Sequence, residues 1–373
     1  MTRAKMAVAA GVLTLAAGLV IALRKPEPAA AETTAIPRER RIRPDPAGER
    51  QLADATVRRS VDSDWNDLLA WLDSAPPPGA EQIRERLLAL RSSWSGMDPH
   101  ALGEVIGRLL ETGGDAETGM DFQVGRHGLL AGWPTLRVFL LDVLAISDPE
   151  MATRIARGIL DSTVSADEFA VGMRSLTRPG LGRAPDAELL SRFSGMLGRD
   201  DWHGSRGFAE AMDLPRLLGS AAAAAELAAW QGNPALKTMA LDEFAAQHPG
   251  AMLEVLTNDV EIDPQVRAEL MARADPREPG QMEQVEIYLN DPARSDAEIE
   301  AFLKAFPLRS STTGHRLYGG TPAPYDFHDI AAADLAARER VSDWMKEPGL
   351  VKHRPGLLRL QQRLDSWIED AKQ

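Results

Sequence analysis

The stretch that decides the fold is residues 134–160, which read PTLRVFLLDVLAISDPEMATRIARGIL. Asp148 is a typical N-capping residue, and Pro149 suits the first turn of a helix, where no amide donor is needed. We expect one helix to end near Ser147 and a second to begin at once. The apolar residues of the first helix follow the i, i+3, i+4, i+7, i+8 spacing of a wide apolar face: Leu136, Phe139, Leu140, Val143 and Leu144.

The same pattern returns one hundred residues later, where residues 234–249 read PALKTMALDEFAAQHP. Lys237 occupies the position that corresponds to Arg137 and carries the same charge. A further step of thirty residues leads from Lys237 to Arg267. Six other positions recur: Pro134, Leu136, Leu141, Asp142, Ala145 and Pro149 correspond to Pro234, Leu236, Leu241, Asp242, Ala245 and Pro249. We therefore expect a chain of stacked helix pairs whose apolar faces merge into one core.

The helical signal continues through the body of the chain from Asp64 onward. Proline, glycine and capping residues separate the predicted helices. Besides the two organising pairs, apolar residues recur at helical spacing in segments near 65–72, 83–94, 99–110, 167–176, 187–197, 217–230, 266–274, 281–289, 295–306, 330–345 and 357–368. A short extended piece around 120–124 fits the pattern, but no β-sheet can be assembled. The sequence predicts an all-α body, either an irregular helical-hairpin solenoid or a multi-helical array.

Parts of this body resemble HEAT-type helical repeats. The resemblance covers residues 134–160 and 234–275, through the Leu-Arg…Leu-Asp…Asp-Pro pattern at 136–149 and the DPQVR sequence at 263–267. It implies stacked helix pairs and a scaffold that binds partners on a concave face. Residues 113–132 and 307–329 depart from a plain repeat.

Composition excludes several classes of function. Residues 51–373 hold 50 acidic and 33 basic side chains, a net charge of −17, which repels nucleic acid. The absence of cysteine excludes disulfides, thiolate metal sites and cysteine nucleophiles. Phosphate-loop, His-Glu-x-x-His and Gly-x-Ser-x-Gly motifs are also missing. We therefore predict no catalytic residues, no metal and no cofactor.

The N-terminal region contains an uninterrupted apolar run, residues 6–23, preceded by Arg3 and Lys5. At about 1.5 Å per residue the run spans roughly 27 Å, the thickness of a bilayer core. A cleavable signal would be cut near residues 29–31, but Arg24 and Lys25 favour a retained anchor. We predict a membrane anchor or signal segment over 1–25, a disordered linker rich in proline and charge over 26–60, and the helical domain over 61–373.

The orientation of this anchor has two interpretations. Six basic residues follow the run within twenty positions and, by the positive-inside rule, would hold the body in the cytoplasm. A short basic N-terminus before an apolar run is, however, the usual export signal. We favour a single-pass protein of the bacterial inner membrane with a periplasmic body. A cytoplasmic body and secretion after cleavage are the alternatives.

Unusual side chains gather in residues 307–329, a long segment for a helical body. One interpretation is a peptide- or ligand-binding loop over the helical groove, with Asp326 and His328 as an acid–base or metal pair. The other, which we favour, is a packed loop whose tyrosines and Phe327 close the core. The candidate binding residues are His315, Tyr318, Tyr325, Asp326, Phe327 and His328.

Two functions follow from these features. The first is a membrane-tethered α-helical scaffold or adaptor that binds a protein partner in the bacterial cell envelope. The alternative is a ligand-binding or hydrolytic domain with its site in the 307–329 loop.

Overall fold

The computed structural model describes residues 46–112, 114–180, 183–258, 261–309, 316–319 and 327–371. The chain divides into two units, Met1–Pro46 and Ala47–Gln373, and the second contains the helical body. The predicted anchor, and the part of the predicted linker that precedes residue 46, lie outside the described residues.

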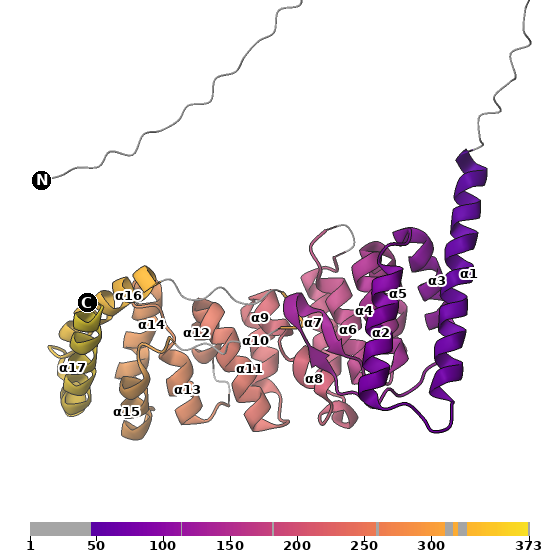
Figure 1. The fold of residues 1–373 in the computed structure, drawn as a ribbon. Helices are drawn as coiled ribbons and strands as arrows, with labels where there is room; N and C mark the ends of the chain where they lie inside the picture. Colours follow the sequence, from indigo (N-terminus) through magenta and orange to yellow (C-terminus); the bar gives the residue numbers. More distant parts are fainter. Residues whose placement is uncertain are drawn as a thin grey trace, which may run out of the picture. The chain divides into compact units, whose positions relative to one another are not determined.

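The helical body is built from successive short helices (Figure 1). The α-helices are α1 Pro46–Leu72, α2 Ala80–Trp94, α3 Pro99–Glu111, α4 Leu136–Ser147, α5 Pro149–Leu160, α6 Ala166–Thr177, α7 Asp186–Leu197, α8 Arg206–Ala211, α9 Leu214–Leu218, α10 Ala221–Ala229, α11 Pro234–Gln247, α12 Pro249–Leu256, α13 Pro264–Met271, α14 Pro279–Asn290, α15 Asp296–Ala305, α16 Phe327–Trp344 and α17 Arg354–Asp370. Three 3-10 helices complete the helical part of the described chain: η1 Arg126–Gly128, η2 Asp200–Trp202 and η3 Pro348–His353.

The prediction of an all-α body is confirmed for the described residues. The strands found there are β1 Gln123–Val124 and β2 Leu130–Gly132, which pair antiparallel between α3 and α4. The tight connection between them needs two left-handed residues, His127 with φ 58° and Gly128 with φ 72°. This hairpin lies inside the predicted glycine-rich interruption at 113–132.

The two organising stretches form helix pairs joined by a single residue. Asp148 connects α4 to α5, and its carboxylate accepts a hydrogen bond from the amide of Met151, as the capping pattern predicts. His248 connects α11 to α12 with a similar backbone, φ −130° and ψ 55° against φ −136° and ψ 86° at Asp148. The N-termini of α4 and α11 differ, because the cap Thr135 follows Pro134, whereas the cap Asn233 precedes Pro234.

Helices from α4 onward follow one another in two rows. One row runs through α4, α6, α8, α9, α11, α13, α15 and α17, with α8 leading into α9 along the chain. The other row runs through α5, α7, α10, α12, α14 and η3. Within it, α5 and α7 both pack against α6 of the first row. Six helices of the first row begin after a residue whose side chain accepts a free amide of the first turn. These cap residues are Thr135, Ser165, Ser205, Asn233, Asp263 and Ser295.

Five ion pairs between helices share one separation, in which residue i pairs with residue i+31. The pairs are Arg137–Glu168, Arg157–Glu188, Asp161–Arg192, Asp242–Arg273 and Arg267–Glu298. The basic residue at the recurring position also contacts the preceding helix. Arg137 donates to the carbonyl of Leu110 at 2.6 Å, and Lys237 donates to that of Trp230 at 2.8 Å. Basic side chains at a helix C-terminus satisfy carbonyls that lack an intrahelical partner.

The recurring aspartates hold the next helix of the row. Asp142 is fully buried, accepts the indole N–H of Trp133 at 3.0 Å and pairs with Arg174 of α6 at 2.7 Å. Asp242 accepts two hydrogen bonds, at 2.6 and 2.7 Å, from Arg273, which follows α13. The Leu-Asp pattern of the sequence therefore marks a link between neighbouring helices of one row.

Two predicted boundaries were wrong. Helix α1 begins at Pro46, so the predicted linker extends too far, and residues 46–60 are helical although most of the described side chains there are exposed. The cause is that this segment has helix-forming residues without an apolar period. The predicted helix 217–230 is two helices, because Gly219 adopts a left-handed φ of 65° and Ser220 caps α10.

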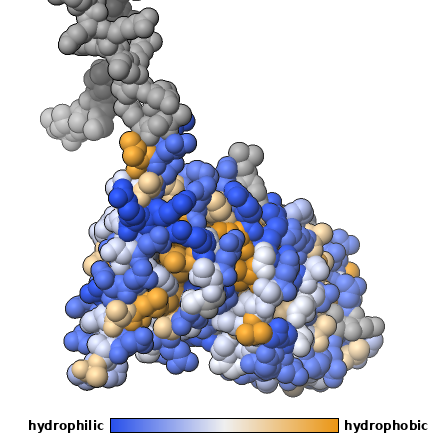
Figure 2. Space-filling view, turned by 90° about the vertical axis from the view of Figure 1, so that its right-hand side faces the viewer, coloured by the Kyte–Doolittle hydropathy of each residue, from blue (hydrophilic) through white to orange (hydrophobic). Residues whose placement is uncertain are grey.

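The face viewed in Figure 2 is mainly hydrophilic, with separate small apolar areas. In the part of the chain that the structure describes, no helix combines the length and apolar character needed to cross a membrane. The apolar run at 6–23 is outside that part.

Candidate functional site

A cavity of about 740 Å³ opens beside the hairpin and the first row of helices, and we call it the charged cleft. Its walls come from Arg84 of α2, the hairpin segment, α8, the two residues between α8 and α9, α11 and Arg316. The lining residues are Arg84, Asp121, Phe122, Gln123, Val124, Arg206, Ala209, Glu210, Met212, Asp213, Met239, Ala240, Glu243 and Arg316. Its volume lies in the range of ordinary ligand sites, about 300–1,000 Å³.

Carboxylates and guanidinium groups form ion pairs in and beside this cleft. Glu210 pairs with Arg206 at 2.7 Å, and Glu243 pairs with Arg316 at 2.5 Å. Asp213 pairs with Arg216, which lies behind the lining and is 7% exposed. Glu243 and Asp213 are buried, whereas Arg206 reaches into solvent. The lining of the cleft therefore combines buried, ion-paired carboxylates with the exposed cation of Arg206.

Burial changes the acidity of two of these carboxyl groups. It raises the pKa of Asp213 to about 6, against the opposing effect of the hydrogen bonds and charge of Arg216. It also raises the pKa of Glu210, against the charge of Arg206. Carboxyl groups with raised pKa values in a cleft are a recognised sign of a functional site, because their proton affinity responds to a bound charge.

Between α15 and α16 the structure describes residues 307–309 and 316–319 of the 307–329 segment, and the second of these pieces packs into the helical body. The Tyr318 hydroxyl donates to the carbonyl of Ala170 in α6 at 3.0 Å, and the backbone carbonyl of Tyr318 accepts a hydrogen bond from Arg216 at 2.5 Å. Gly128 of the hairpin lies so close to Leu317 that a Cβ would come within 2.7 Å of the Leu317 carbonyl oxygen. The segment thus joins helices more than one hundred residues away in sequence, unlike a repeat that touches only its neighbours.

The predicted binding residues can be located only in part. Tyr318 is fully buried, and burial together with the charge of Asp213 raises the pKa of its hydroxyl well above the ordinary value. It fits the packing interpretation and does not line the charged cleft. His315, Tyr325 and Asp326 lie outside the described residues. Phe327 and His328 begin α16, but their side chains are not described. The Asp326–His328 pair therefore stays a prediction.

Sequence reasoning missed the residues that line the cleft. Arg316 belongs to the 307–329 segment, but its sequence neighbours do not distinguish it as a site residue. Glu243 follows the recurring Asp242 directly, and Asp213 precedes a proline-containing helix, so neither had an unusual pattern. Their proximity depends on contacts between distant segments, and the sequence carries no local signal for it.

Comparison with protein-family models, with curated proteins and with solved structures gave no match for this chain. The functional inference therefore depends on the geometry of the chain itself.

Proposed function

We propose that this chain is a helical-repeat scaffold that binds a segment of a partner protein in the charged cleft. The single observation that carries the proposal is the cleft itself, a cavity of about 740 Å³ that combines buried carboxylates with apolar side chains such as Phe122 and Met212. Binding interfaces commonly combine an apolar centre with polar groups that fix orientation.

The repeated helix pairs support a HEAT-like arrangement for this scaffold. The single-residue joints at Asp148 and His248 and the regularly spaced ion pairs are what a stack of similar units would produce. Helices α8 and α11 of the first row, with the two residues between α8 and α9, contribute eight of the fourteen lining residues, so the proposed binding surface would follow the row.

The charge of the body indicates the chemistry of the partner. The lining holds four carboxylates and three guanidinium groups, and residues 51–373 carry a net charge of −17. A segment with lysine or arginine side chains would be steered toward such a surface, and its binding would weaken with added salt. We propose a basic segment of a protein as the partner.

Photo-crosslinking from the full chain, in membranes of the cells that produce it, tests this proposal. A photoreactive residue at Met239, which lies in the cleft lining and is 46% exposed, should give a discrete crosslinked species that declines with added salt. The matched control is Ile287 of α14, which is 57% exposed and lies outside the cleft lining. Equal crosslinking from both positions, or none from Met239, would exclude the cleft as the binding surface.

We also propose that residues 6–23 anchor the chain with its body in the periplasm. A C-terminal alkaline phosphatase fusion, active only after export, should be active, and a C-terminal green fluorescent protein fusion exported through the same route should stay dark. The opposite pattern would place the body in the cytoplasm and would change the set of accessible partners.

A further inference from the structure

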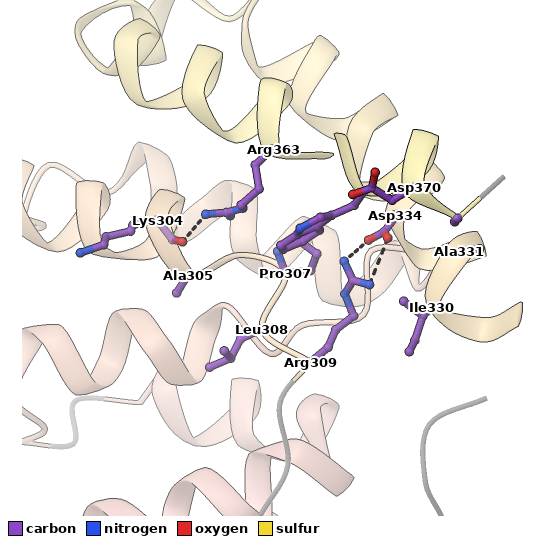
Figure 3. A pocket seen from close by; sticks show the side chains of 12 residues that line it. Lys304, Ala305, Pro307, Leu308, Arg309, Ile330, Ala331, Asp334, Arg363 and Asp370 are labelled. Carbon is purple, nitrogen blue, oxygen red and sulfur yellow. Dashed lines mark hydrogen bonds and ion pairs between the residues drawn. The ribbon is translucent and has the colours of Figure 1, made fainter. Parts of the chain in front are cut away.

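A second cavity, of about 600 Å³, lies where α15, α16 and α17 meet, and we call it the Trp367 cavity (Figure 3). Most of its surface is apolar. Its lining residues are Lys304, Ala305, Pro307, Leu308, Arg309, Ile330, Ala331, Asp334, Arg363, Trp367, Asp370 and Ala371. It is separate from the charged cleft, since the two share no lining residue.

Two guanidinium groups flank the aromatic wall of this cavity. The guanidinium carbon of Arg309 lies 4.6 Å from the centre of the Trp367 ring, and that of Arg363 lies 5.2 Å from it. Arg309 also donates to the carboxylate of Asp334, as the dashed lines in Figure 3 show. Asp334 is 2% exposed, so this pair neutralises itself inside the wall.

The charge of Arg363 is not balanced in the same way. Its guanidinium donates to the carbonyls of Leu303, Lys304 and Phe306 at the end of α15. Among the described residues, no carboxylate forms an ion pair with Arg363, and its Nε is buried without a hydrogen-bond partner. Burial lowers the pKa of Arg363, and the nearby charge of Arg309 lowers it further. A neighbouring anion would therefore stabilise this cation.

The remaining charges of the lining cancel. Lys304 and Asp370 are both exposed, with opposite signs, and solvent screens them. The cavity therefore combines an apolar volume, an aromatic wall and one uncompensated cation that is only partly exposed. Charge-assisted hydrogen bonds to such a cation are stronger than those between neutral groups.

We propose that the Trp367 cavity binds a small organic anion, an apolar or aromatic body that carries one carboxylate. The apolar body would lie along Trp367, Leu308 and Ile330, and the carboxylate would face Arg363. The cavity volume suits a molecule of this kind, because ligand sites of about 300–1,000 Å³ bury most of the surface of a small ligand.

A pair of probes with opposite charges tests the proposal on the full chain. Titration calorimetry with 4-phenylbutyrate should show binding about tenfold or more tighter than with 4-phenylbutylamine, which has the same apolar body and a positive charge. Wild-type protein that binds both probes equally, or neither, would overturn the proposal.

Three variants assign the effect to the cavity. Arg363→Met should remove the preference for the anion, while Arg363→Lys should keep a reduced preference. Ala331→Trp should fill the cavity and abolish binding of both probes. The matched control is Arg338→Met on the exposed face of α16, which should bind like the wild type. If Ala331→Trp still binds 4-phenylbutyrate as the wild type does, the probe occupies another site and the proposal fails.

Discussion

The buried aspartate Asp142 gives the most demanding prediction of stability. Its carboxylate accepts from the Trp133 indole at 3.0 Å and from the Leu130 amide at 3.3 Å, and it pairs with Arg174 at 2.7 Å. The side chain of Asp142 has no exposure, and that of Arg174 has 4%. The substitution Asp142→Ala therefore leaves a buried cation without its counter-charge. Breaking a buried pair in this way costs about 3–5 kcal/mol.

The assay is urea unfolding followed by tryptophan fluorescence, with the free energy taken from the first cooperative transition. The control is Asp62→Ala, because Asp62 pairs with Arg108 at 2.8 Å but both side chains are about 40% exposed. Exposed pairs contribute at most about 1 kcal/mol. A loss at Asp142 no larger than the loss at Asp62 would refute the argument that this carboxylate holds α4 and α6 together.

Three further predictions concern the segment 316–319 and its surroundings. Gly128→Ala should lower the melting temperature, with a cost of about 1–3 kcal/mol, because the φ of Gly128 is 72° and the Leu317 carbonyl oxygen would clash with a Cβ. The control is Gly195→Ala inside α7, where no atom obstructs a Cβ, and this change should raise stability by about 0.5–1 kcal/mol. Tyr318→Phe should cost about 1 kcal/mol in denaturant unfolding, since it removes the hydrogen bond to Ala170, and no loss would mean that this bond is absent. The free energy of unfolding of the wild type should fall relative to that of Asp213→Asn as the pH rises from about 4 to 6. The folded state holds the Asp213 proton more tightly than the unfolded state, whose ordinary pKa is 3.8, so this contribution is present below pH 3.8 and lost as the pH passes 6. Parallel pH profiles would contradict that assignment.

The sequence was informative where a local signal determines the structure. Asp148 and Pro149 predict the start of α5 by themselves, because a capping residue followed by proline favours a helix start independently of distant contacts. The same holds for Ser295 before α15, where the hydroxyl accepts the amide of Glu298. These signals were enough to predict an all-α body and the joint between α4 and α5.

The sequence did not predict contacts between side chains from distant segments. The sequence shows that Asp142 and Asp242 recur. Their ion-pair partners, Arg174 in α6 and Arg273 after α13, lie two helices further along the chain and share no distinctive sequence pattern. Arg316 reaches Glu243 across 73 residues. The charged cleft depends on such contacts, so its residues could not be found from periodicity. The Trp367 cavity has the same origin, since α15 and α17 meet only after the chain has folded.

We propose that equivalent, regularly spaced positions couple successive helices of one row. Charge reversal at Asp242 and Arg273 tests this coupling most directly, because their two hydrogen bonds join α11 to the second residue after α13. Asp242→Arg and Arg273→Asp alone should each lower the free energy of unfolding by about 2–4 kcal/mol, since each places like charges together next to the interior. The double variant should recover most of that loss. If it instead loses the sum of the two single effects, the residues are not coupled and the proposed stacking of the helices is wrong.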